Sequence, residues 1–366
     1  MNCIKRVIFQ QILRVFIMLF LTVAFISCAH SPEAVEHGIF ATSRLESVIG
    51  QDGVCSIKFS DKITLWTFAD TITGRWKSES GRIAGDKNEA IMDGMLSNSI
   101  AWSEKVTEKN YKHIRLNFYK ENGKTAQFIK NKKNENPLKH RFWALDGFRT
   151  GNKVYVYYLH IYVPDHAEFL DFKVLYSGLA RWDIPRGWKP GDRINFRRLG
   201  PLFVKGTPFF GAAVMEKDGY VYTAGHFKKN SKEFPISIAR VKVENVENVK
   251  AYSFLSREGE WVSDIKNSGE FIGDVSGECS LSYNDYLKEY IIIYSKAFTG
   301  DIGSVRFKDF SKLPAAGKNT VFRVHKAGSS GMWPYSGKEI FSSGGSLFLI
   351  YIDPVRYQPL LVELKY

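Results

Sequence analysis

The sequence lacks the short motifs that mark several common enzyme classes. It contains no Gly-x-Ser-x-Gly elbow, no P-loop and no Rossmann fingerprint. It also has no Cys-x-x-Cys pair and no histidine pair at zinc-binding spacing. The sequence therefore gives no support to a serine hydrolase, a nucleotide-binding protein or a dehydrogenase. We predict no cofactor and no metal site.

Cysteine is scarce, with four residues in 366. Cys3 and Cys28 belong to the N-terminal segment, so only Cys55 and Cys279 remain for a folded domain. An oxidising compartment would permit a disulfide between these two residues. Two buried free thiols agree equally well with the sequence.

Long apolar runs are absent after the N-terminus. The single run covers residues 15–26 and follows three basic residues, which is the pattern of a signal peptide over residues 1–27. The string Phe25-Ile26-Ser27-Cys28 resembles a bacterial lipobox, although that motif prefers Leu where Phe25 stands. We predict lipidation of Cys28, with an ordinary signal peptide or an uncleaved anchor as alternatives. All three place residues 29–366 outside the cytoplasm, and the first makes the protein a membrane-anchored lipoprotein of the bacterial cell envelope.

Acidic residues are the minority, since 38 Asp and Glu face 51 Lys and Arg. The excess of 13 positive charges falls to 10 after residues 1–27, which hold three basic residues and no acidic one. A basic surface suits nucleic acid, anionic lipid or an anionic polymer. Because export is predicted, nucleic acid is the weakest of these, and we predict no nucleic-acid partner.

Aromatic residues are abundant, with 27 Phe, 18 Tyr and 8 Trp. Such residues favour half-buried strands, and no long helical periodicity follows the N-terminal segment. Turn signals recur along the chain at Asp52-Gly53, Asn122-Gly123, Asp146-Gly147 and Asp218-Gly219. These patterns predict an all-β protein, with a tether over residues 28–47 and one domain over residues 48–366, which we expect to be a monomer.

One unit of two strands occurs five times. Each copy has a short first strand, a polar turn and an aromatic or β-branched second strand. The copies are 55–59 with 63–68, 142–145 with 154–158, 210–214 with 220–222, 279–283 with 290–294, and 340–343 with 347–351. Small residues in the first strands suit the crowded axis of a propeller, so we predict a five-bladed β-propeller. The alternative is a β-sandwich.

The segment Ile63-Thr-Leu-Trp-Thr-Phe-Ala-Asp70-Thr71 resembles the signature "lWlFGDT" of a bacterial secreted family, domain of unknown function 4185. Further similar segments follow in order: Met95-Leu-Ser-Asn-Ser-Ile-Ala101, Ser177-Gly-Leu-Ala-Arg-Trp182, Gly211-Ala-Ala-Val-Met215, Gly219-Tyr-Val-Tyr222, Ile238-Ala-Arg240 and Glu278-Cys-Ser-Leu-Ser-Tyr-Asn284. Ala69 replaces the usual glycine of the signature. The chain therefore resembles a divergent member of this family.

The resemblance implies the fold of arabinanase-type glycoside hydrolases, and hence an extracellular polysaccharide as partner. It also allows a bound cation on the propeller axis, although no pattern in the sequence indicates one. Fold alone does not establish catalysis, because one fold hosts many functions.

The predicted propeller brings eight polar residues to one face. They lie before a first strand or after a second strand, and these ends open on the same side. The eight are Asp52, His140, Arg141, Glu278, Asp70, His160, His226 and Asp353.

Glycoside hydrolysis needs two carboxyl groups beside the scissile bond, one protonated and one ionised. We predict Asp52 and Asp70 as this catalytic pair, because both belong to the first unit and match acidic positions that the family resemblance favours. Glu278 is a third catalytic candidate, as an acid or as a modulator of pKa. We also predict substrate binding by a set of four residues: His140, Arg141, His226 and Asp353.

Each of these residues also has a purely structural interpretation. Asp52 before a glycine is typical of a turn, and Asp70 before Thr71 is typical of a cap. Two functions therefore compete: a glycoside hydrolase acting on an arabinan-like or other polysaccharide, and a non-catalytic propeller that binds glycan or protein. A purely structural envelope lipoprotein is the third.

Overall fold

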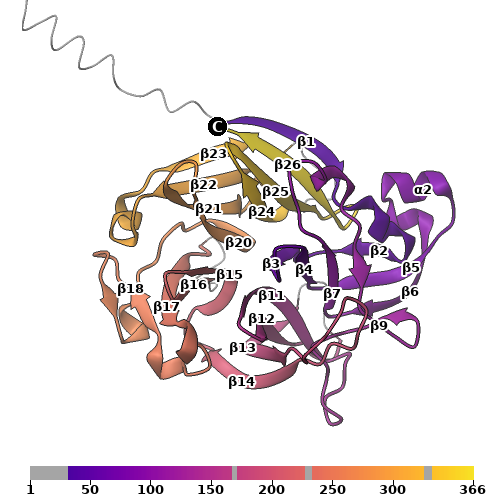
Figure 1. The fold of residues 1–366 in the computed structure, drawn as a ribbon, viewed down its shortest axis with the longest axis horizontal. Helices are drawn as coiled ribbons and strands as arrows, with labels where there is room; N and C mark the ends of the chain where they lie inside the picture. The colour runs from indigo at the N-terminus through magenta and orange to yellow at the C-terminus, as the bar shows by residue number, and fades with distance from the viewer. Residues whose placement is uncertain (1–31, 167–170, 227–232, 325–331) are drawn as a thin grey trace, which may run out of the picture. The chain divides into compact units, whose positions relative to one another are not determined.

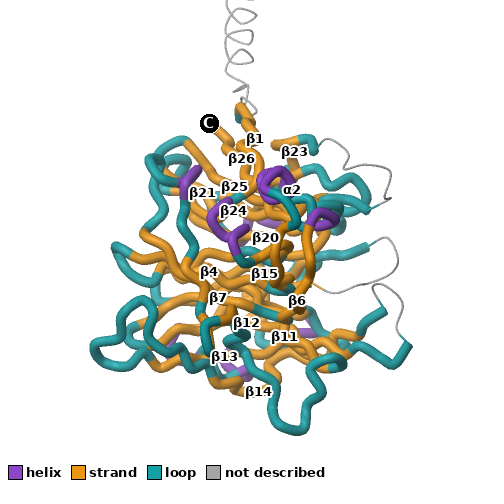
Figure 2. The backbone as a smooth tube through the Cα atoms, turned by 90° about the vertical axis from the view of Figure 1, so that its right-hand side faces the viewer, coloured by secondary structure: helices purple, strands orange, loops and turns teal. Residues whose placement is uncertain are grey.

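The computed structural model describes residues 32–166, 171–226, 233–324 and 332–366. The predicted signal peptide and the lipidation at Cys28 lie outside the described residues. None of the helices within these ranges is long and apolar enough to cross a membrane. Residues 34–365 form one compact unit that is built mainly of strands (Figures 1 and 2).

Five large antiparallel sheets follow one another along the chain. The first sheet holds β3 (Cys55–Lys58), β4 (Ile63–Phe68), β7 (Ser99–Glu104) and β8 (Asn117–Phe118). The second holds β11 (His140–Thr150), β12 (Lys153–Tyr162), β13 (Lys173–Asp183) and β14 (Arg197–Val204). The third holds β15 (Phe209–Lys217), β16 (Tyr220–His226), β17 (Ile236–Lys242), β18 (Ser253–Leu255) and β19 (Trp261–Val262).

The fourth sheet holds β20 (Val275–Asn284), β21 (Glu289–Lys296), β22 (Ile302–Phe307) and β23 (Lys318–Phe322). The fifth joins the two ends of the unit in the order β1 (Glu33–Ile39), β26 (Gln358–Lys365), β25 (Ser346–Asp353) and β24 (Tyr335–Ser343). Two small sheets are insertions: β2 (Val48–Gln51) with β5 (Thr71–Trp76) and β6 (Ala90–Leu96), and β9 (Lys120–Glu121) with β10 (Lys124–Thr125).

Among the described residues, helical structure is limited to short pieces in the connections. One α-helix, α2 (Glu79–Ala84), begins after the capping hydroxyl of Ser78 and ends at Gly85. The remaining helices are 3-10 turns: η1 (Thr42–Glu46), η2 (Lys87–Glu89), η3 (Tyr111–His113), η4 (Val243–Asn245), η5 (Val249–Ala251), η6 (Ile265–Asn267) and η7 (Phe310–Ala315).

Each of the five predicted strand pairs forms the first hairpin of one large sheet. The pairs are β3 with β4, β11 with β12, β15 with β16, β20 with β21, and β24 with β25. The first strands also contact one another in turn: β3 with β11, β11 with β15, β15 with β20, β20 with β24, and β24 with β3. Figure 1 shows these strands nearest the middle of the unit.

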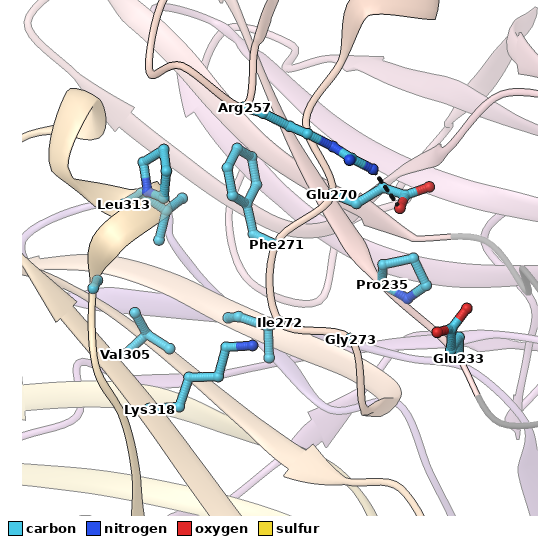
Figure 3. Close-up of a pocket in the computed structure, with 12 residues that line it drawn as sticks. Glu233, Pro235, Arg257, Glu270, Phe271, Ile272, Gly273, Val305, Leu313 and Lys318 are labelled. Atoms are coloured by element: carbon cyan, nitrogen blue, oxygen red, sulfur yellow. Dashed lines mark hydrogen bonds and ion pairs between the residues drawn. The ribbon is translucent and has the colours of Figure 1, made fainter.

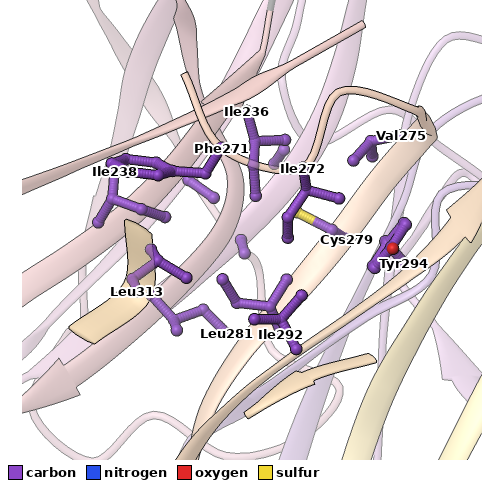
Figure 4. Close-up of a cluster of buried hydrophobic side chains, with 14 of the residues drawn as sticks. Ile236, Ile238, Phe271, Ile272, Val275, Cys279, Leu281, Ile292, Tyr294 and Leu313 are labelled. Atoms are coloured by element: carbon purple, nitrogen blue, oxygen red, sulfur yellow. The ribbon is translucent and has the colours of Figure 1, made fainter. Parts of the chain in front are cut away.

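The second strands are buried on both faces, because a sheet packs on either side of them. Ile291, Ile292 and Ile293 are consecutive in β21, and all three are fully buried. Figure 4 shows part of the core between the third and fourth sheets, where Ile236, Ile238 and Leu281 belong to one buried cluster. The continuous apolar runs in the sequence follow from this two-sided burial.

Four of the five first strands carry β-bulges. The pairing register shifts between Ala144 and Gly147 in β11, between Phe210 and Ala213 in β15, between Val275 and Cys279 in β20, and within β24. A bulge bends a strand and turns a side chain to a new direction. Asp146 and Glu278 lie in such bulges.

Two expectations from the sequence are corrected. The predicted tether over residues 28–47 is wrong from residue 33 onward, because β1 and η1 occupy most of that stretch and Phe40 is fully buried. Asp146 and Gly147 do not form a turn; they lie inside β11, and the hairpin turns at Gly151 and Asn152. An Asp-Gly pair serves a bulge here because glycine tolerates the close approach of Tyr155 O.

Asn98 ties the first sheet to the second. Its side-chain amide donates to the carbonyls of Ile129 and Phe142, each at 3.0 Å, and its carbonyl oxygen accepts from the amides of Phe128 and Ile129 at 3.0 and 2.9 Å. Asn98 is fully buried, so water cannot replace these bonds.

We therefore expect Asn98→Ala to lower the free energy of unfolding by about 3 kcal/mol or more, since several buried backbone groups lose their partners. Denaturant unfolding followed by circular dichroism measures this change. The exposed Asn88→Ala serves as the control and should change stability by less than about 0.5 kcal/mol. Equal effects of the two substitutions would contradict the assignment.

Candidate active site

The predicted pair Asp52 and Asp70 lies on adjacent backbone segments. Asp52 precedes β3 and Asp70 follows β4, and the amide of Asp52 donates to the carbonyl of Asp70 at 3.1 Å. The amide of Ala69 donates back to the carbonyl of Asp52 at 3.1 Å. Gly53, with φ of +63°, lies so close to Ala69 that a side chain at position 53 would collide with it. The two acids therefore share one end of the first sheet.

Asp52 is held by two tyrosines from the fifth sheet. The hydroxyls of Tyr335 and Tyr357 both donate to its Oδ2 atom at 2.8 Å. Burial raises the pKa of Asp52 to about 8, and the charges of Asp70 and Glu278 act in the same direction, while the two hydroxyl bonds oppose it. Oδ1 is buried with no hydrogen-bond partner among the described atoms, so it is the oxygen left to carry a proton.

Asp70 is held by two side chains of β11. Its Oδ2 accepts from Arg141 Nη1 at 3.2 Å, and its Oδ1 accepts from Trp143 Nε1 at 3.0 Å. Asp70 is only 6% exposed. Burial raises the pKa of Asp70 to about 6, and the guanidinium and the indole limit the rise because both bind the ionised form.

The two carboxyl groups interact electrostatically, since the charge of Asp70 raises the pKa of Asp52. With values of about 8 for Asp52 and about 6 for Asp70, the pair holds one proton at neutral pH. That proton belongs mainly to Asp52, while Asp70 is ionised beside Arg141. The arrangement thus supplies one proton donor and one carboxylate side by side, which is the division of roles that acid–base chemistry requires.

Glu278 is a third acidic group near the pair, and we call Asp52, Asp70 and Glu278 together the acidic centre. Its Oε2 accepts from the Ser336 hydroxyl and lies 3.9 Å from Nζ of Lys338. Burial alone would raise the pKa of Glu278, but Lys338 and the Ser336 hydroxyl hold it below its ordinary value. Glu278 therefore remains a carboxylate near Asp52.

The other predicted site residues divide into two groups. Arg141 reaches the acidic pair, and His226 faces Glu278 while burial lowers its pKa. His140 and His160 instead contact each other, Nδ1 to Nε2 at 3.0 Å. Asp353 uses its carboxylate in a turn, where it accepts from the amides of Val355 and Arg356.

Sequence reasoning missed the partners of the acids: Trp143 as a hydrogen-bond donor, Tyr335, Ser336, Lys338 and Tyr357. Tyr335 could have been found, because it lies at the start of β24, the first strand of the fifth sheet, and Asp52 lies near the start of β3, the first strand of the first sheet. Lys338 had no such signal, since lysine within a strand usually points to solvent.

The two cysteines of the domain are free and buried. Cys55 Sγ accepts from Lys338 Nζ at 3.2 Å, and Cys279 lies in the apolar core of Figure 4. Burial raises the pKa of both thiols to about 12, so both are neutral.

Two pockets lie elsewhere on the unit. One has a volume of about 420 Å³ and is shown in Figure 3; Phe271 and Leu313 line it, together with the ion pair of Arg257 and Glu270. The second has a volume of about 460 Å³ and includes Phe59 and Trp188. None of the acids of the centre lines either pocket.

The side chains of the first strands do not form a site that fits a bound cation. Among the described residues no group of three or more His, Cys, Asp and Glu side chains is placed to hold a metal ion. The carboxyls of Glu278 and Asp146 face the ammonium group of Lys338 instead. No chemical step is therefore assigned to a metal.

The fold is all-β, and solved structures share it. The chain is similar to a candidate hydrolase from Bacteroides ovatus ATCC 8483, with 14% identity, a TM-score of 0.61, and coverage of 86% of this chain and 85% of that chain. It is also similar to Zg3597, a family 117 glycoside hydrolase of Zobellia galactanivorans, with 9% identity, a TM-score of 0.50, and coverage of 91% and 90%.

The chain belongs to the family described as "Domain of unknown function (DUF4185)", which matches residues 47–349. This confirms the family resemblance of the sequence. No curated protein matches the chain. At the identities given above, the similarity to solved structures shows a fold shared with glycoside hydrolases.

The raised pKa of Asp52 predicts a pH-dependent stability effect. The folded protein binds a proton at Asp52 that the unfolded chain releases above its ordinary pKa of 3.8, so this group lowers stability as pH rises toward about 8. Asp52→Asn removes the effect while it keeps an oxygen for both tyrosines.

We expect Asp52→Asn to become more stable than the wild type as pH rises from about 4 to about 8, with a constant difference above that range. Thermal unfolding across this range measures the difference. The control is Asp61→Asn, whose side chain is 89% exposed. A difference that is independent of pH would show that Asp52 titrates as an ordinary aspartate.

Proposed function

We propose that this protein is a glycoside hydrolase that acts on an extracellular polysaccharide through Asp52 and Asp70. The observation that carries the proposal is the buried carboxyl pair, in which one member holds a proton and the other is ionised at neutral pH. Hydrolysis of a glycosidic bond needs one carboxyl in each state.

In this proposal Asp52 is the general acid. Its proton on Oδ1 passes to the glycosidic oxygen of the leaving sugar, and the tyrosine hydroxyls on Oδ2 stabilise the carboxylate that results. Asp70 acts as the carboxylate on the opposite side of the bond, as a base toward water or as a nucleophile. Arg141 and Trp143 fix its orientation.

Three observations support the choice of a glycan. The fold is shared with a family 117 glycoside hydrolase. The two cysteine thiols near the acids are buried and neutral, so neither is an activated nucleophile. The family resemblance in the sequence favours an arabinan-like polymer among polysaccharides.

We further propose that the unit is a five-bladed β-propeller, with one blade for each large sheet. The circular order of contacts among β3, β11, β15, β20 and β24 supports this count. Lipidation at Cys28 would hold the propeller at the cell envelope, where polysaccharide is present.

Non-catalytic binding is the second candidate. It is favoured by the ion pair between Asp70 and Arg141, which occupies the carboxylate in the absence of substrate. In a binding module the same residues would recognise sugar hydroxyls without transferring a proton.

The decisive experiment measures release of reducing ends from a panel of arabinans and other envelope polysaccharides by the wild type, Asp52→Asn and Asp70→Asn. We expect each variant to lose about 10²- to 10⁴-fold in rate, which is the usual contribution of a positioned acid or base. Asp61→Asn is the matched control. Folded variants as active as the wild type would rule out this pair.

The pKa values also predict a bell-shaped dependence of kcat/KM on pH. Activity rises as Asp70 ionises near about pH 6 and falls as Asp52 loses its proton near about pH 8. Arg141→Gln should move the acidic limb to higher pH, because the guanidinium lowers the pKa of Asp70. An unmoved acidic limb would show that another group sets it.

A further inference from the structure

Lys338 is an ammonium group enclosed by the first strands. It lies on β24 with a side chain that is 2% exposed. A buried charge is costly unless it is paired with an opposite charge and hydrogen-bonded. The stability of this buried charge therefore depends on the groups that surround Lys338.

Groups from three other first strands face Lys338. Its Nζ atom donates to Cys55 Sγ of β3 at 3.2 Å and lies 3.9 Å from Glu278 Oε2 of β20. Asp146 of β11 and the Cys279 thiol of β20 also interact with it electrostatically. Since both thiols are neutral, Glu278 and Asp146 are the counter-charges.

Asp146 connects Lys338 to β15, the remaining first strand. Its Oδ1 accepts from the amide of Gly147 at 2.8 Å, and its Oδ2 accepts from the amide of Val214 of β15 at 2.7 Å. Contacts from all five first strands thus meet around one positive charge.

The charge of Lys338 affects the ionisation of Asp52 through Glu278. Lys338 favours the ionised form of Glu278, and ionised Glu278 disfavours ionisation of Asp52. Without Lys338, burial would favour a protonated Glu278, and Asp52 would then lose one of the two negative neighbours that help it keep its proton.

We propose that Lys338 is a positioning residue of the acidic centre, a built-in counter-ion that keeps Glu278 ionised and leaves the inner strands with no need for a bound metal cation. The proposal deepens the proposed function and rests on it for its catalytic meaning. The effect of Lys338 on the ionisation of Glu278 and Asp52 can be measured on the full protein without a substrate.

The first test is a double-mutant cycle of Lys338→Met and Glu278→Gln, read by thermal unfolding at about pH 8 and about pH 5. At the higher pH we expect Lys338→Met to lower the unfolding temperature by about 10 °C, because the buried Glu278 must then take up a proton that the unfolded chain does not bind at that pH. Adding Glu278→Gln should recover at least half of that shift.

At the lower pH the loss caused by Lys338→Met should shrink, because protonation of the buried Glu278 costs less as pH falls toward the ordinary pKa of glutamate, 4.5. Lys58→Met is the control, since Lys58 lies on β3 with a side chain that is 77% exposed. A loss that is independent of pH and not recovered by Glu278→Gln would overturn the proposal.

The second test measures the pH at which Asp52 titrates. The stability difference between Asp52→Asn and its parent, followed against pH, gives the pH at which Asp52 titrates. We expect this pH to fall by at least about half a unit in the Lys338→Met background, with a matching shift of the basic limb of kcat/KM. An unchanged titration of Asp52 would overturn the positioning role.

The third test adds a chelator to the wild type. We expect an unchanged unfolding temperature, whereas a decrease that calcium reverses would overturn the claim that Lys338 replaces a cation. If no polysaccharide is hydrolysed, the proposed function fails, while the unfolding experiments still decide whether Lys338 controls Glu278 and Asp52.

Discussion

Four carboxyl groups are enclosed where the first strands meet, and among the described residues two cations interact with them, Arg141 and Lys338. Asp52, Asp70, Asp146 and Glu278 cannot all be ionised together at low dielectric. Arg141 stabilises the charge on Asp70, and Lys338 stabilises the charges on Glu278 and Asp146. Asp52 has only neutral hydroxyl donors, so it keeps a proton. The uneven supply of positive charge thus divides the acids into donors and acceptors of protons.

The backbone makes this arrangement possible. Bulges in β11 and β20 turn Asp146 and Glu278 inward, where a regular strand would alternate its side chains between the two faces of the sheet. Gly277 has φ of +74°, and a side chain there would collide with Ser336, the residue that donates to Glu278. The irregular positions in the first strands therefore serve the acidic centre.

The sequence predicts the hairpins well because each has a local signal: a polar turn between two short apolar strands. It also predicts the proximity of Asp52 and Asp70, since both flank one hairpin. Tyr357 and Tyr335 escape prediction because they come from the other end of the chain, and their register against the first sheet depends on long-range packing. The sequence cannot distinguish a turn from a bulge at Asp146, because Asp-Gly pairs suit both.

The fifth sheet joins β1 to β26, although more than 300 residues separate them in the chain. During synthesis or export β1 emerges first and has no partner until the last strand has appeared. The unit therefore cannot be completed gradually from one end; its last folding step closes a loop of almost the whole chain. This delays assembly of the acidic centre, because Tyr335 and Tyr357, which hold Asp52, belong to that same final sheet and its turn. A chain that ends before Tyr335 therefore lacks both hydroxyl groups that hold Asp52.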